Sequence, residues 1–108
     1  MLRFRMNGSQ GDAYDVEAER HNDRVRITCT CEAGHRGIHC HHRLELLHGD
    51  VTALASDNAA DVTKLAVLIE GTELGAALVA LIAAEAAQTA AKAERDRRMH
   101  AIDRLMQG

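Results

Sequence analysis

Three cysteines and five of the seven histidines gather in one short stretch of this 108-residue chain. The cysteines lie between Cys29 and Cys40, in the order Cys29-x-Cys31, eight further residues, then Cys40-x-His42. An odd number of cysteines makes a poor disulfide framework. Thiolate sulfur and imidazole nitrogen are, in contrast, the ligands that closed zinc sites use. The spacing therefore indicates metal chemistry.

The local chain must bring these two pairs together. Residues two apart in a strand point to the same side, so Cys29 and Cys31 can offer two sulfurs on one face. Residues two apart within a regular helix lie about 200° apart around its axis and could not easily chelate, whereas Cys40 and His42 can do so at the non-helical entry to a first turn. Three thiolates and one imidazole leave no open position, which suits one structural Zn²⁺ per chain held by Cys29, Cys31, Cys40 and His42.

Several alternatives compete with this interpretation. In one alternative the fourth ligand is His35, His39 or His41 in place of His42, although the spacing favours His42. A Cys3His iron–sulfur cluster of the CDGSH type needs a histidine where this chain has Leu44. A catalytic cysteine–histidine pair needs an accessible, activated thiolate, which a zinc-saturated sulfur is not. The remaining alternative is three buried cysteines without a metal.

The elements around the motif are predicted from periodicity. Alternation of apolar and polar residues predicts three strands and hence a small antiparallel sheet. A glycine-containing loop at 32–39 and a short helix at 40–48 would follow, and residues 50–60 remain ambiguous. Two further helices are expected, the first ended by Gly71 and the second capped by Thr72. The chain is therefore predicted to be α+β, with strands at 2–6, 14–19 and 25–31 and helices at 40–48, 61–70 and 73–106.

Residues 25–47 resemble a SWIM zinc finger, whose pattern is Cys-x-Cys, a variable loop and Cys-x-His. The alternating strand before Cys29, Gly37 three residues before Cys40, and the apolar helix after His42 agree with that family. The resemblance covers about a quarter of the chain and implies zinc at the four ligands named above. Family members are generally thought to mediate DNA binding or protein–protein contact.

The last predicted helix is too long for a compact domain of this size. At about 1.5 Å per residue it would extend roughly 50 Å, so much of it should project or pack on another chain. Positions 74, 81, 88, 95 and 102 hold Leu, Leu, Gln, Arg and Ile, a broken heptad. We expect a zinc-finger domain at 1–50 and a helical tail at 51–108, with self-association through the apolar ends of the tail.

Composition limits the function further. Thirteen basic and sixteen acidic residues give a net charge of −3, and neither half of the chain is strongly basic. With one Phe, one Tyr and no Trp, the core is thin, so a bound metal would supply part of the folding energy. No uninterrupted run of about 18 apolar residues and no signal-peptide h-region is present, so we expect a cytoplasmic protein without a membrane span.

These observations predict a structural zinc-binding protein that acts as a protein-interaction or assembly module through its helical tail. No motif of an enzyme active site is present, so no catalysis and no small-molecule substrate are expected. The alternative function is nucleic-acid binding by basic residues around the finger. Its candidate contacts are Arg24, Arg26, Arg36 and Arg43.

Overall fold

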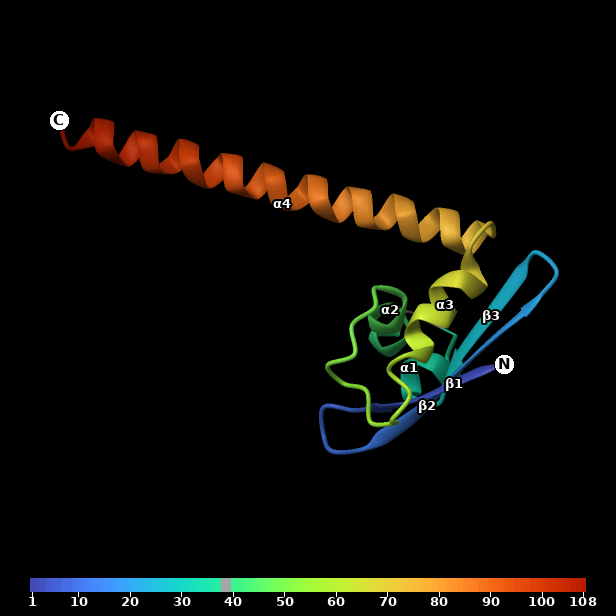
Figure 1. Cartoon of the computed structure of the whole chain (residues 1–108). Coiled ribbons are helices and arrows are strands. Elements are labelled where there is room, and N and C mark those ends of the chain that lie inside the picture. The colour runs from blue at the N-terminus through green and yellow to red at the C-terminus, as the bar shows by residue number, and fades with distance from the viewer. Residues whose placement is uncertain (38–39) are drawn as a thin grey trace. The chain divides into compact units, whose positions relative to one another are not determined.

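The structure, a computed structural model, describes residues 1–37 and 40–108 and confirms the predicted α+β class. Its contacts divide the chain into two compact units, Met1–Ala76 and Ala77–Gly108, which are described separately. The domain boundary expected at residue 50 stays a prediction. The elements, labelled in Figure 1, are β1 (Leu2–Asn7), β2 (Ala13–His21), β3 (Arg24–Cys29), α1 (Glu32–His35), α2 (His41–Leu47), α3 (Asp61–Ile69) and α4 (Glu73–Met106).

The three strands form the expected antiparallel sheet in the order β1-β2-β3. Asn22 has a φ of 56° in the turn between β2 and β3, a left-handed conformation that asparagine tolerates better than most residues. The register sets Phe4 opposite Val16, and Val16 opposite Cys29. All three side chains are buried. The first metal-ligand candidate therefore belongs to the hydrophobic face of the sheet.

Helices α2 and α3 complete the core of the first unit. Helix α2 contacts β3 and α3, and α3 also contacts β2. Leu65 of α3 and Leu46 of α2 are each only 2% exposed. This packing closes a small core around one face of the sheet. Its buried aliphatic and aromatic members are Phe4, Met6, Val16, Ala18, Leu46, Val62, Leu65 and Ile69.

The segment at 50–60, ambiguous in sequence, runs beside β1. Leu54 forms an isolated antiparallel bridge with Met6. The amide of Asn7 donates to the carbonyl of Ala53 at 2.7 Å, and the amide of Ala55 donates to the carbonyl of Arg5 at 2.7 Å. We name residues 53–56 the edge strap, because they satisfy backbone groups along the outer edge of β1.

The loop expected at 32–39 is partly wrong, because residues 32–35 form the short helix α1. Cys31 is its N-cap, and the Cys31 sulfur accepts a hydrogen bond from the Gly34 amide at 3.3 Å. An N-cap acceptor of this kind supplies a partner for an otherwise unpaired amide, which favours a helical turn over an open loop.

Helix α4 begins as the sequence predicts. Gly71 has a φ of 76°, and the Thr72 hydroxyl accepts a hydrogen bond from the Gly75 amide at 3.1 Å. A side chain at Gly75 would collide with the carbonyl oxygen of Ile69, so the junction requires glycine. No described residue of α4 is buried.

Helix α4 also has a composition that bears on membranes. Of the helices formed by the described residues, α4 alone is long and apolar enough to cross a membrane, and its most apolar 18-residue window has a mean hydropathy of 1.6. This rests on length and composition only. The expectation of no membrane span rests on the lack of an uninterrupted run of apolar residues, and Glu85 breaks that run. An average over 18 residues still reaches a high mean hydropathy when it includes one charged residue. The absence of a membrane span therefore stays a prediction.

A pair of substitutions in α3 tests the core. Leu65→Ala removes a buried side chain and should lower the free energy of unfolding by about 2–4 kcal/mol. Val67→Ala on the same helix changes a side chain that is 64% exposed and should shift it by less than about 0.5 kcal/mol. Urea unfolding followed by circular dichroism measures both. Equal effects would contradict the packing described here.

Candidate metal centre

The four predicted ligands meet where the sheet ends and the short helices begin. Cys29 is the last residue of β3, and Cys31 caps α1. Cys40 is the N-cap of α2 in an extended conformation, and His42 is the second residue of that helix. All four side chains are buried, and their ligand atoms lie within 4.8 Å of one another. The structure therefore contains a Cys3His group that could bind a metal ion.

The distances fit a tetrahedral ion. The sulfurs of Cys31 and Cys40 are 3.3 Å apart, and Nδ1 of His42 lies 3.6 Å from the Cys40 sulfur and 3.8 Å from the Cys29 sulfur. Zinc bonds of about 2.3 Å to sulfur and about 2.0 Å to nitrogen would set tetrahedral neighbours about 3.5–3.8 Å apart. Small movements would bring the four atoms onto one ion.

The side chain of His42 offers a defined ligand atom. Nδ1 faces the sulfurs, whereas Nε2 is buried with no hydrogen-bond partner among the described residues. With its proton on Nε2, the neutral ring leaves the Nδ1 lone pair for a metal. The rings of Tyr14 and His41 lie against it, with centroid distances of 5.1 and 4.1 Å. Tyr14 was not predicted at the site, because only the strand register brings β2 here.

A glycine allows α1 to approach the end of β3. A side chain at Gly34 would collide with the backbone carbonyl oxygen of Cys29. The sequence suggests Gly34 as a turn residue, but its role is this close approach, which places Cys31 beside the other ligands. Such a contact has no signal in a single sequence.

The environment shifts the pKa values of three ligands. Burial raises the pKa of the Cys29 thiol to about 12. Burial also acts to raise the pKa of Cys31, but the hydrogen bond from the Gly34 amide and those with Cys40 and Cys29 outweigh it, so the pKa is lowered. Burial, with the positive charge of His41, lowers the pKa of His42. His42 is therefore held in the neutral form that a metal requires.

The other histidines lie differently. His41 is exposed, as expected for a residue beside a ligand on a helix, and His35 is exposed on α1. His39 lies outside the described residues. The buried cluster thus supports His42 among the described histidines. Because all three thiols are buried and free of disulfides, the cysteines also lack the exposure of a nucleophile.

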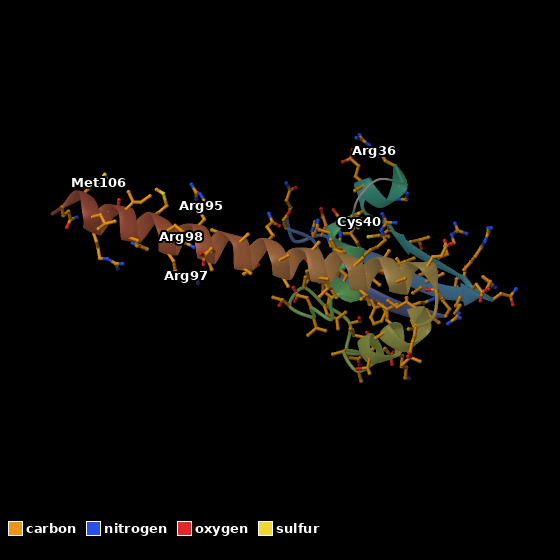
Figure 2. The ribbon with its side chains drawn as sticks, turned by 90° about the horizontal axis from the view of Figure 1, so that it is seen from above. Arg36, Cys40, Arg95, Arg97, Arg98 and Met106 are labelled. Carbon is orange, nitrogen blue, oxygen red and sulfur yellow. The ribbon has the colours of Figure 1, made fainter. Side chains whose placement is uncertain are left out.

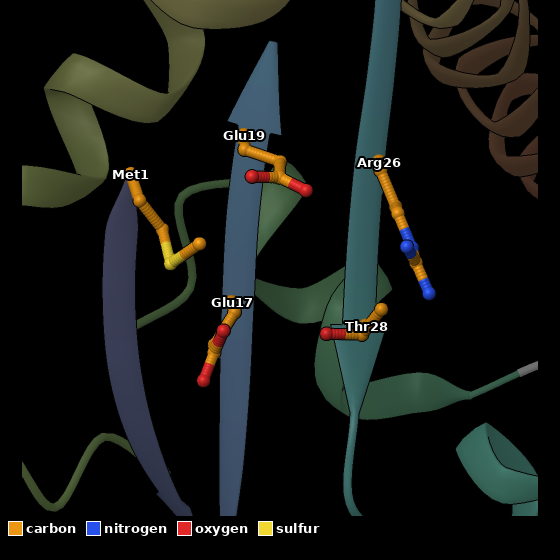
Figure 3. A pocket seen from close by; sticks show the side chains of 5 residues that line it. All are labelled: Met1, Glu17, Glu19, Arg26 and Thr28. Atoms are coloured by element: carbon orange, nitrogen blue, oxygen red, sulfur yellow. The ribbon is translucent and has the colours of Figure 1, made fainter.

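Two of the candidate nucleic-acid contacts lie on β3. Arg24 and Arg26 are exposed, on the opposite side of the strand from Cys29. Arg26 lines a shallow pocket with Glu17 and Glu19 of β2 (Figure 3). Two carboxylates therefore lie on the same face of the sheet as Arg26, and Glu19 is its cross-strand neighbour.

The other two arginines have partners of their own. Arg36, the C-cap of α1, forms an ion pair with Glu32 at 2.7 Å. Nη1 of Arg43, on α2, donates to the carbonyl of Ile27 at 3.2 Å. The four arginines therefore belong to three elements and are interspersed with acidic and backbone partners. Figure 2 shows Arg36 on its short helix, with Cys40 nearby in the view.

Comparison with family models, curated proteins and solved structures finds no match to this chain. The resemblance to a SWIM finger therefore rests on the four residues and their setting.

Two neighbouring histidines provide a test of the site. His42→Ala removes one of four ligands and should weaken zinc binding by at least about 100-fold, because loss of an outer hydrogen-bond partner alone costs about 10–100-fold. His41→Ala, on the adjacent exposed residue, should leave affinity within about 3-fold. Competition with a chromophoric chelator measures both. Equal losses would remove His42 from the ligand set.

The lowered pKa of His42 predicts a direction for pH dependence. Below the unfolded-state pKa of about 6.5, His42 binds a proton in the unfolded chain but resists it in the folded chain. The free energy of unfolding should therefore decrease as the pH is lowered. Urea midpoints at pH 7.5, 6.5 and 5.5 should decrease in that order. His41→Ala should keep this trend. A midpoint that rises on acidification would contradict it.

Proposed function

We propose that this chain is a structural zinc module of the SWIM type that serves protein interaction or assembly through its helical tail. The main support for this proposal is the buried Cys3His group, whose ligand atoms lie within 4.8 Å of one another. Four protein ligands occupy all four coordination positions of a tetrahedral ion and leave none for substrate or water, which is typical of structural sites. The proposed role is therefore not enzymatic.

The small core supports a structural role for the metal. Apart from Phe4, the buried apolar side chains of the first unit are aliphatic or sulfur-containing. Cys31 caps α1, and Cys40 and His42 lie at the start of α2, so the candidate ligands stand at the points where both helices meet the end of β3. A metal bound there would join β3, α1 and α2, so its binding energy would contribute to folding.

The tail supports the interaction role. Helix α4 has 34 residues and none is buried. Its large apolar side chains are left exposed, with Val79 at 69%, Leu105 at 80% and Met106 at 72%. Exposed apolar side chains gathered on one element are typical of interaction sites. A protein partner is preferred over nucleic acid because the net charge is −3 and two of the four arginines, Arg26 and Arg36, lie beside carboxylates.

Native mass spectrometry of protein purified without added metal tests this proposal. We expect one zinc per chain, and loss of sheet signal in circular dichroism after chelation. A metal-free chain with readily alkylated thiols and an intact sheet would overturn the structural zinc role.

Titration of labelled single- and double-stranded DNA and RNA at about 50 mM salt tests the alternative function. Electrostatic binding is strongest at low salt, so an interaction module that does not bind nucleic acid should give no signal there. Binding that weakens steeply with salt would replace the protein-interaction role by the nucleic-acid role. Arg24→Glu and Arg26→Glu would then locate the contact.

A further inference from the structure

One row of residues along α4 has an unusual order of side chains. Taken at alternating steps of four and three residues, it follows the a and d positions of a heptad repeat, which share one side of a helix. We name it the seam. It consists of Leu74, Leu78, Leu81, Glu85, Gln88, Lys92, Arg95, Met99, Ile102 and Met106. Three apolar residues are followed by four polar ones and three more apolar ones.

The seam is symmetric about residue 90. If a second copy of the helix runs in the opposite direction, Leu81 faces Met99 of that copy and Glu85 faces its Arg95. The remaining layers are Leu74 with Met106, Leu78 with Ile102, and Gln88 with Lys92. Every layer therefore joins apolar to apolar, acid to base or polar to polar. Each a position meets a d position, as antiparallel packing requires.

The parallel arrangement lacks this agreement. There each seam residue would face its own copy, so Glu85 would meet Glu85, Lys92 would meet Lys92 and Arg95 would meet Arg95. Like charges placed together disfavour a wrong pairing. The polar centre of the seam therefore selects the antiparallel direction.

The charge along the whole helix favours the same direction. Residues 73–90 carry two acidic and no basic side chains, a net charge of −2. Residues 91–106 carry five basic and three acidic ones, a net charge of +2. Figure 2 shows Arg95 and Arg97 on different sides of this basic half. Antiparallel pairing sets each acidic half beside a basic half and opposes the two helix dipoles.

The seam is also accessible and flanked by small residues. Leu81, Met99 and Ile102 are 38%, 48% and 51% exposed, although they are large and apolar. Alanines at 77, 84 and 91 lie along one border of the seam, where a small side chain lets two helices approach closely. The stripe that a partner would cover is therefore available in a single chain.

We propose that α4 pairs with α4 of a second copy, antiparallel, in the register that sets Leu81 against Met99 and Glu85 against Arg95. This rests on the proposed function, because it names the partner of the helical tail. The pair has two-fold symmetry, so every layer occurs twice and the arrangement closes as a dimer.

The first unit contains a place for the end of the second helix. Leu74, the first seam residue, lines an apolar groove of about 330 Å³ with Val25 and Ile27 of β3 and Leu44 and Leu47 of α2. In the proposed register Leu74 faces Met106 of the second copy. The exposed C-terminal end of that copy would therefore lie at this groove.

A charge exchange in the full-length, zinc-loaded protein tests the register. Glu85→Arg and Arg95→Glu each place like charges in two layers and should raise the dimer dissociation constant by about 10-fold or more. The double variant restores opposite charges and should return it to within about 3-fold of the parent. Arg104→Glu changes the charge equally on the outer side of the helix and serves as the control. Sedimentation equilibrium measures all four.

Disulfide trapping tests the direction separately. Leu81→Cys with Met99→Cys should give covalent dimers under mild oxidation, because these residues face each other in the antiparallel pair. Leu81→Cys alone should not, since the two copies of residue 81 are then far apart. Cross-linking of the single variant, or single charge variants without rescue by the double variant, would overturn the register.

The remaining outcomes separate this proposal from the proposed function. A zinc-loaded chain that stays monomeric up to several hundred micromolar overturns the dimer and leaves the zinc module standing. A chain that is purified without metal, keeps an intact sheet and still dimerises with charge rescue overturns the zinc role and leaves the pairing standing. Flotation of the monomer with phosphatidylcholine–phosphatidylglycerol vesicles would assign the apolar part of α4 to a membrane and overturn the pairing.

Discussion

The convergence of four ligand atoms at the end of β3 is the constraint on which the first unit depends. The sheet supplies Cys29, and two short helical segments supply the rest. Isolated helices of four and seven residues are far below the length that is stable in water, so α1 and α2 need tertiary contacts to persist. Metal ligation would add the strongest of these contacts, because it fixes the N-cap of each helix, Cys31 or Cys40, to Cys29 of the sheet.

The same constraint explains how the first unit forms a buried core with few large side chains. A chain with one phenylalanine and one tyrosine cannot bury much aromatic surface. The register instead aligns Phe4, Val16 and Cys29 across the sheet, so that the apolar face continues into the metal-ligand group. The core and the Cys3His group are therefore one continuous buried region, and a change in either is expected to affect the other.

Much of this fold and most of the candidate site are predictable from the sequence. Alternation predicts the three strands, and the two-residue spacing of Cys29 with Cys31 and of Cys40 with His42 singles out the ligands. The predicted strand at 25–31 is wrong at its end, because β3 stops at Cys29 and Cys31 instead caps α1. Helix α1 is not predictable, because it depends on the close approach of Gly34 to the Cys29 carbonyl. The edge strap is not predictable either, since its residues follow no period and are held by backbone hydrogen bonds to β1. The acidic first half and basic second half of α4 are visible in the sequence. The symmetry of the seam about residue 90 is missed when only every seventh residue (74, 81, 88, 95 and 102) is compared, because it relates the a positions to the d positions.

The edge strap has a consequence for how copies of this protein can associate. An uncovered outer strand offers a row of amides and carbonyls to any passing chain, and so invites open-ended sheet growth. Here the amide and carbonyl of Arg5 and the amide of Asn7 are already engaged by residues 53–56. Recruitment of further strands is blocked on that side. Assembly is thereby diverted away from fibre-like extension and towards contacts between side chains, whose number a finite surface limits.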